Sequence, residues 1–149
     1  MPSVKYALPE FLAGRCAPEA YHRWLSRKAI AHVKRDRKRG HEKVTREVYM
    51  IAIHKAVIAS RGLDDYTGQK LAWESISKYD NMKSKDGSGQ YKKSLWDLPS
   101  LDHCGDDITA NAFRICAWRT NDCKNDLNYD QLIDFCRMIL AHHEAKSGK

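Results

Sequence analysis

Residues 97–127 decide the fold, and they read DLPSLDHCGDDITANAFRICAWRTNDCKNDL. The run from Leu98 to His103 is short and strand-like, and an acidic turn follows it. Apolar and polar residues alternate from Ala112 to Trp118, which predicts a second strand. The stretch from Asn121 to Leu127 can form one short helix, in which residues three and four apart share a face. The sequence therefore predicts the order strand, loop, strand, helix.

Five polar residues occur in a fixed order along this stretch. Asp102 and His103 close the first strand, Asn111 leads into the second, and Asn121 and Lys124 lie on the helix. In this respect the segment resembles the catalytic core of the HNH, or His-Me finger (ββα-metal), nucleases. The resemblance is confined to residues 97–127, and it implies hydrolysis of a phosphodiester bond at this site.

The resemblance assigns a role to each of these residues. His103 would be the general base, since a histidine near its ordinary pKa can take a proton from water. Asp102 and Asn121 would hold a divalent ion, Mg²⁺ or Mn²⁺, because such ions prefer oxygen ligands. Asn111 would tie the loop together as part of the catalytic set, which is His103, Asn111 and Asn121. Neighbouring strand residues point to opposite sides, so Asp102 and His103 can share a site only where the strand ends and twists.

Structural interpretations of the same residues stay open. His103 can be a core or surface histidine, Asp102 can form a strand-end turn, and Asn121 can cap the helix. Asp106 and Asp107 are interpreted as a solvated turn. The chain also departs from the family: the interval after His103 is short, and the zinc-binding CxxC pairs of many relatives are absent.

The positive charge is concentrated in the first part of the chain. Residues 1–62 hold 14 Lys and Arg against 5 Asp and Glu, a net of +9, whereas residues 63–149 hold 12 against 14, a net of −2. A basic part joined to a mildly acidic part suits a protein that grips a polyanion beside a carboxylate-bearing site. Nucleic acid is the expected partner, DNA more than RNA. Binding to its backbone would depend on salt and little on base sequence.

Fourteen cations are expected to contact the nucleic acid. They are Arg27, Lys28, Lys34, Arg35, Arg37, Lys38, Arg39, Lys83, Lys85, Lys92, Lys93, Arg114, Arg119 and Lys124. A solvated helix face is the structural alternative for those in the first helix, where cations near the C-terminus also favour the helix dipole.

Outside the central segment, helical spacing of apolar residues predicts four elements. A helix from Pro18 to Arg39 stops at Gly40, and a buried helix runs from a Thr45 cap to Ser60. A shorter helix covers residues 69–79, and a packing helix with Asn128 as its cap covers residues 128–149. Residues 81–94 form a lysine-rich loop by composition.

These elements predict a single α+β domain over residues 1–149, mostly helical, with a ββα-metal core. Within it, residues 1–62 are the basic nucleic-acid-binding part, 63–96 a helix plus loop, 97–127 the core and 128–149 the packing helix. The chain is long enough for a core without disulfide staples.

Composition narrows the class of protein. No apolar run is long enough to span a membrane and the N-terminus lacks a signal-peptide core, so we expect an intracellular, cytoplasmic protein without membrane contact. Five cysteines without a CxxC pair are expected to be free thiols.

The sequence thus predicts a metal-dependent endonuclease with a histidine general base. Two alternatives remain: a nucleic-acid-binding protein that keeps the finger fold without turnover, and a structural protein with zinc on Cys104, Cys116, Cys123 and a histidine. A homodimer is possible, since one such site cuts one strand at a time.

Overall fold

The computed structural model describes residues 4–77, 95–104 and 113–148. Its longer elements are α1 (Pro18–Lys38), α2 (Arg46–Ser60), β1 (Pro99–His103), β2 (Phe113–Ala117), α5 (Trp118–Lys124) and α6 (Tyr129–Ser147). Three short 3₁₀ turns accompany them: η1 (Val4–Tyr6), η2 (Glu10–Leu12) and η3 (Trp73–Ser75). The expected α+β class is confirmed, and one apolar core takes residues from α1, α2, the three 3₁₀ turns and both strands.

Both long N-terminal helices begin and end as predicted. Pro18 is the first residue of α1, where its missing N–H is not needed. The Thr45 hydroxyl caps α2 by accepting a hydrogen bond from the Val48 amide at 3.2 Å. Beyond α2 the chain turns at Arg61 and Gly62, both with positive φ. A Cβ at Gly62 would lie 3.2 Å from the Phe11 ring, so close packing also favours glycine there.

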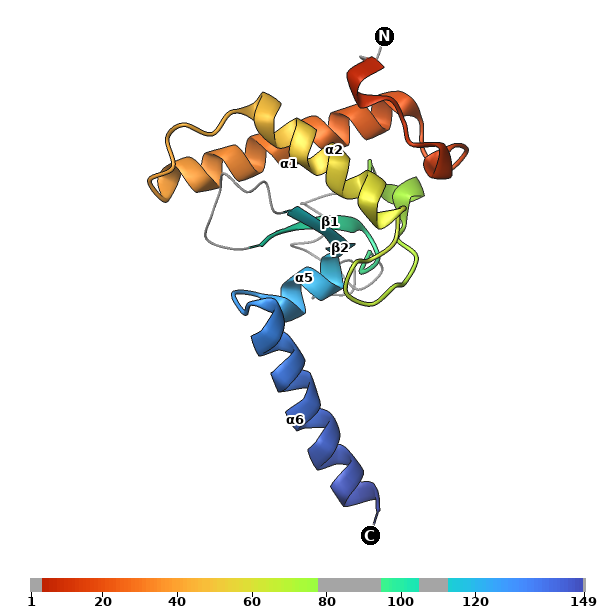
Figure 1. Ribbon diagram of the computed structural model, residues 1–149. Helices are drawn as coiled ribbons and strands as arrows, with labels where there is room; N and C mark the ends of the chain where they lie inside the picture. Colours follow the sequence, from red (N-terminus) through yellow and green to blue (C-terminus); the bar gives the residue numbers. More distant parts are fainter. Residues whose placement is uncertain (1–3, 78–94, 105–112, 149) are drawn as a thin grey trace, which may run out of the picture.

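The two strands form an antiparallel hairpin between the helices (Figure 1). The pair α1 and α2 covers one face of the hairpin and α5 the other. In the strand register Asp102 pairs with Arg114, and His103 with Phe113. The alternation of strand side chains therefore directs His103 towards α1 and α2, and Asp102 towards α5.

Asp64 links the turn after α2 to the hairpin and α5 through hydrogen bonds. Its buried carboxylate accepts hydrogen bonds from the Ala117 amide at 2.8 Å and the Thr120 hydroxyl at 2.6 Å. It also accepts from the amides of Tyr66 and Thr67, at 2.7 and 3.0 Å. These bonds hold Tyr66 beside the end of β1.

The predicted helix over residues 69–79 is wrong over the part that the structure describes, where only the turn η3 is helical. Lys70 instead forms a β-bridge with Leu63, and the Ala72 amide donates to the Asp97 carbonyl at 2.8 Å. Backbone pairing with distant segments thus replaces the helix that local spacing favoured. Residues 78 and 79 lie outside the described residues.

The last helix forms as predicted, but beyond its first turn it does not pack against the described part of the chain. Asn128 and Gln131 make a capping box at the start of α6. None of the residues of α6 is buried, however, and the helix extends away from the rest of the chain (Figure 1).

Two observations concern membrane-spanning helices and the state of the cysteines. In the described ranges, no helix combines the length and the apolar character that crossing a membrane requires. All five cysteines are free thiols, as expected.

Candidate active site

His103 closes β1 and is held by a carboxylate from the basic helix. Its Nδ1 lies 3.1 Å from Oδ2 of Asp36 on α1, and the two side chains are 7% and 3% exposed. The same Asp36 oxygen accepts a hydrogen bond from the Tyr49 hydroxyl on α2, at 2.7 Å. Because an ionised carboxylate only accepts hydrogen bonds, Nδ1 must carry the proton in this contact. The lone pair of the neutral ring is then on Nε2.

That second nitrogen, Nε2 of His103, is buried and has no hydrogen-bond partner among residues 4–77, 95–104 and 113–148. Buried polar side-chain atoms nearly always have one, so an exception calls for a functional explanation. Burial holds the pKa of His103 below its ordinary value, and the nearby Asp36 carboxylate only partly opposes this shift. The ring is therefore neutral at neutral pH, which is the form that can accept a proton.

Aromatic neighbours fix the plane of the His103 ring. Phe113 on β2 stacks against it, with ring centroids 4.4 Å apart and an interplanar angle of 14°. Tyr49 and His32 meet it edge-on, at 5.7 and 6.1 Å. Burial lowers the pKa of His32 to about 3, so this second ring stays uncharged beside His103.

Asp102 makes its contacts on the other side of the strand. Its Oδ2 lies 3.0 Å from Nζ of Lys124 on α5, and both side chains are nearly buried. The Tyr66 hydroxyl donates to the same oxygen, and the Cys104 thiol lies 3.3 Å from it. Burial by itself would raise the pKa of Asp102, but the hydrogen bonds from Tyr66 and Lys124 outweigh it and the pKa is lowered. The carboxylate is thus ionised and already paired with a cation.

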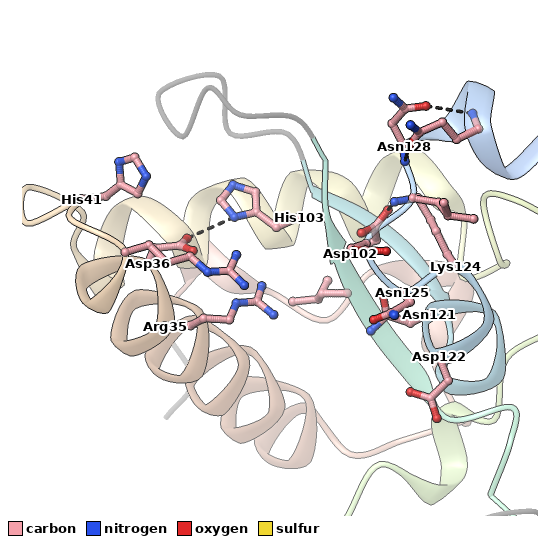
Figure 2. Close-up of a pocket in the computed structure, with 15 residues that line it drawn as sticks. Arg35, Asp36, His41, Asp102, His103, Asn121, Asp122, Lys124, Asn125 and Asn128 are labelled. Atoms are coloured by element: carbon pink, nitrogen blue, oxygen red, sulfur yellow. Dashed lines mark hydrogen bonds and ion pairs between the residues drawn. The ribbon is translucent and has the colours of Figure 1, made fainter.

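A cavity of about 1010 Å³ lies at the end of β1, and side chains from both faces of the strand line it (Figure 2). Asp36 reaches across from α1 to His103, while α5 supplies the opposite wall (Figure 2). The residues lining the cavity are Arg35, Asp36, Arg39, His41, Leu101, Asp102, His103, Asn121, Asp122, Lys124, Asn125, Asp126, Leu127, Asn128 and Gln131. Asp102 and His103 thus both line one cavity at the end of β1.

Asn121 also lines this cavity, from a position one turn before Lys124 on α5. Capping does not explain it, because the N-cap residue of α5 is Ala117. Asn111, the remaining predicted catalytic residue, lies outside the described residues, as do Asp106 and Asp107.

The cations predicted to bind nucleic acid are divided among several places. Arg35, Arg39 and Lys124 line the cavity. Arg27 and Lys28 line a second cavity of about 540 Å³ between α1 and the start of β1.

Other predicted cations have structural contacts elsewhere. Arg37 donates to the Val44 carbonyl, Arg114 lies over the rings of Tyr66 and Tyr129, and Arg119 donates to Gln69. Lys34 and Lys38 are exposed on α1. The four loop lysines, Lys83, Lys85, Lys92 and Lys93, lie outside the described residues.

A divalent ion would find oxygen ligands but few carboxylates here. In residues 4–77, 95–104 and 113–148, no three His, Cys, Asp or Glu side chains form a group that could hold a metal ion. Asp102 and Asn121 supply the donor chemistry that Mg²⁺ prefers, and Mg²⁺ commonly uses one or two carboxylates together with water and substrate phosphate. Since Nζ of Lys124 holds Oδ2 of Asp102, an ion at this oxygen would have to displace the ammonium group.

Three residues of the site were not predicted from the sequence: Asp36, Tyr49 and Tyr66. A signal for Asp36 was present, since Leu25, Ala29, His32 and Asp36 recur at helical spacing and are all buried on one face of α1. Lys and Arg residues flank Asp36 in the sequence, so its place on this buried face is hard to recognise. Nothing local marks Tyr49 or Tyr66 as partners of carboxylates that lie far away in the sequence.

No protein-family model, curated protein or solved structure matches the chain, so the function proposed below rests on the residues and their geometry.

Proposed function

We propose that this protein is an endonuclease that hydrolyses phosphodiester bonds of nucleic acid, DNA rather than RNA, with His103 as the general base. The observation that carries the proposal is the contact between Asp36 and His103. It leaves a neutral ring whose buried Nε2 has no partner among the described residues, in a side chain that lines the same cavity as Arg35, Arg39 and Lys124.

The chemistry follows from these groups. Hydrolysis of a phosphodiester needs a water molecule that loses a proton as it attacks phosphorus, and Nε2 is the basic atom available for that proton. Asp36 accepts a hydrogen bond from Nδ1–H and so stabilises the imidazolium ion that forms when Nε2 takes a proton. The cations of the cavity compensate the negative charge that develops on the phosphate oxygens.

The order of the elements supports the same proposal. β1, β2 and α5 follow one another in the chain and pack together, with His103 at the end of β1 and Asn121 on α5. This is the arrangement that the resemblance to the HNH nucleases implies.

A divalent ion, Mg²⁺ or Mn²⁺, is part of the proposal. Asp102 and Asn121 are the residues that would hold it, once the Lys124 ammonium moves from the carboxylate. When bound, such an ion polarises the scissile phosphate as a Lewis acid. Lys124 lines the same cavity, and its ammonium would pair with the substrate phosphate.

Nicking of supercoiled plasmid DNA tests the proposal. Wild type is expected to convert supercoiled to open-circular DNA with Mg²⁺ or Mn²⁺, and His103→Ala is expected to be slower by about 10²- to 10⁴-fold, the usual contribution of a general base. His142→Ala is the matched control, because His142 is exposed on α6, away from the cavity. A parallel reaction on RNA compares the two substrates.

Two results would count against the nuclease. Equal cutting by wild type and His103→Ala would remove the role of His103. DNA binding without cutting under either ion would favour a non-catalytic binding protein, an alternative that the pairing of Asp102 with Lys124 also supports. Circular dichroism of each variant confirms that it is folded.

A further inference from the structure

The second cavity, of about 540 Å³ between α1 and the start of β1, has mostly apolar residues in its wall. Trp24 and Ile76 belong to this wall and are almost fully buried, at 2% and 6% exposure. Trp118, the first residue of α5, also lines the cavity, and its amide donates to the Leu98 carbonyl at 2.9 Å. The volume falls within the roughly 300–1,000 Å³ of small-molecule sites, and two indole rings suit a flat ligand.

The charge of this cavity is positive. Arg27 and Lys28 line it, and no Asp or Glu is found among the described residues of its wall. Lys28 is half-buried and has no hydrogen-bond or ion-pair partner in the described part of the chain. Burial, and then the like charge of Arg27, lower the pKa of its ammonium group. The Cys116 thiol supplies no counter-charge, because burial raises its pKa. An anionic ligand would therefore offset the cost of burying this cation.

Arg27 is fixed beside Lys28 by a single hydrogen bond. Its Nη2 donates to the Ile76 carbonyl at 3.0 Å, and no other partner of this guanidinium is found in the ranges that the structure describes. A guanidinium has five N–H donors, so others remain for a ligand, and their planar arrangement matches phosphate oxygens. The two cations and the two indole rings thus correspond to the phosphate and the base of a nucleotide.

The second cavity is continuous in the fold with the candidate active site. The same three elements, α1, β1 and α5, border both cavities. Lys28 in the second cavity and Arg35 in the first are seven residues apart on α1, which places them on the same side of the helix and about 10 Å apart. A nucleic-acid strand covers this distance in about three nucleotides, at a rise of about 3.4 Å for each.

We propose that the second cavity holds one unpaired nucleotide of the strand that is cleaved, about three nucleotides from the cut. Its base stacks on Trp118, and its phosphate pairs with Lys28 and Arg27. A base within a duplex is paired and stacked, so it has to leave the helix before a cavity can hold it. The inference rests on the proposed function and narrows its substrate to nucleic acid with an unpaired stretch beside the cleavage site.

Fluorescence anisotropy of a labelled octathymidylate, measured without divalent ions so that nothing is cleaved, tests the stacking. Trp118→Leu is expected to bind it about 5- to 150-fold more weakly than wild type, which is the loss of one base–aromatic stack. Trp118→Phe keeps an aromatic ring and is expected to retain most of the affinity. Trp96→Leu is the matched control, because Trp96 is exposed and lines neither cavity, and it is expected to bind like wild type.

An octamer with the same phosphates but without bases separates stacking from charge. Wild type and Trp118→Leu are expected to bind this abasic octamer equally, since it offers no base to stack. Lys28→Met is expected to reduce the slope of log K against log salt by about 0.7, the value for one phosphate contact with a single strand. Lys55→Met removes an exposed lysine of α2 that lines neither cavity, and it is expected to leave the slope unchanged.

Three results would overturn the proposal. The first is equal binding of octathymidylate by Trp118→Leu and Trp96→Leu, and the second is wild-type binding of octathymidylate no tighter than that of the abasic octamer. The third is competition by thymidine monophosphate as tight as that by octathymidylate, which would assign the cavity to a free nucleotide. Circular dichroism of each variant confirms that it is folded.

Plasmid nicking by the same proteins keeps this proposal apart from the nuclease itself. Nicking without base-dependent binding would remove the role of the second cavity and leave the nuclease. Base-dependent binding without nicking would remove the nuclease and leave the second cavity as a nucleotide site.

Discussion

Asp36 joins the basic helix to His103, and replacing it with asparagine is the most informative change to the site. The side chain is 3% exposed and accepts two hydrogen bonds, from His103 Nδ1 at 3.1 Å and Tyr49 at 2.7 Å. Asparagine keeps the shape, but a neutral amide oxygen replaces the charged oxygen that both donors contact, so both hydrogen bonds lose their charged partner. A hydrogen bond to a charged group contributes about 1.5–3 kcal/mol, and we expect a loss of stability in that range.

The catalytic effect of Asp36→Asn should exceed what destabilisation explains. An amide can either accept from Nδ1–H or donate to a bare Nδ1, so it no longer selects the ring form with its proton on Nδ1, and part of the general-base contribution of about 10²- to 10⁴-fold is lost. We expect kcat for plasmid nicking to fall about 10- to 100-fold, with little change in KM.

A pH profile distinguishes this role from a purely structural one. The charge of Asp36 raises the pKa of His103, against the larger lowering by burial. Removing that charge lowers the pKa of His103 further, so the acid limb of the profile should shift to lower pH. Asp97→Asn, at an exposed carboxylate, is the control and should leave the profile unchanged. A folded Asp36→Asn protein with wild-type kcat and an unshifted acid limb would refute the reasoning.

Two further predictions concern buried charge. Lys124→Met leaves the Asp102 carboxylate without its cation, which should destabilise the protein by about 3–5 kcal/mol. Mn²⁺ should then raise the thermal midpoint of the variant more than that of wild type. An equal response in both proteins would contradict a metal site at Asp102. His32 is neutral when folded, with its pKa lowered to about 3, but binds a proton near pH 6.5 when unfolded. Its contribution to stability is therefore complete above about pH 6.5 and lost as the pH falls towards 3, by up to about 1.4 kcal/mol per pH unit. The free energies of unfolding of wild type and His32→Phe, measured by denaturant titration, should diverge in this pH range. Parallel curves would show that His32 does not cause the loss of stability.

Much of the fold follows from local patterns that the sequence displays. Pro18, the Thr45 cap and the Asn128 cap place three helix starts, and the alternation around Phe113 places β2. These features act within a few residues of themselves, so they can be read without knowing what packs against them. The helix expected over residues 69–79 does not form where the structure describes it, because contacts outside the segment decide its backbone: it pairs with Leu63 and Asp97.

The residues of the site also fall into two groups: those that one local segment identifies, and those that only tertiary packing brings close. His103, Asp102 and Asn121 were identified because they lie on one short segment whose order resembles a known core. Their partners Asp36 and Tyr66 come from elements more than 30 residues away, and only the packing of α1 and the Asp64 turn brings them close. The charge-compensated state of Asp102 could therefore not be predicted from residues 97–127 alone.

Chemical rescue of His103→Ala by imidazole tests the central claim most directly, namely that Nε2 of His103 takes a proton from the attacking water. The variant leaves an imidazole-sized space at the edge of the cavity, and added imidazole can supply the missing base there. We predict that imidazole restores nicking by His103→Ala in a dose-dependent way, with a pH dependence that follows its own titration, and that it leaves wild type unaffected. Nicking by a folded His103→Ala protein at the wild-type rate without imidazole would contradict the account.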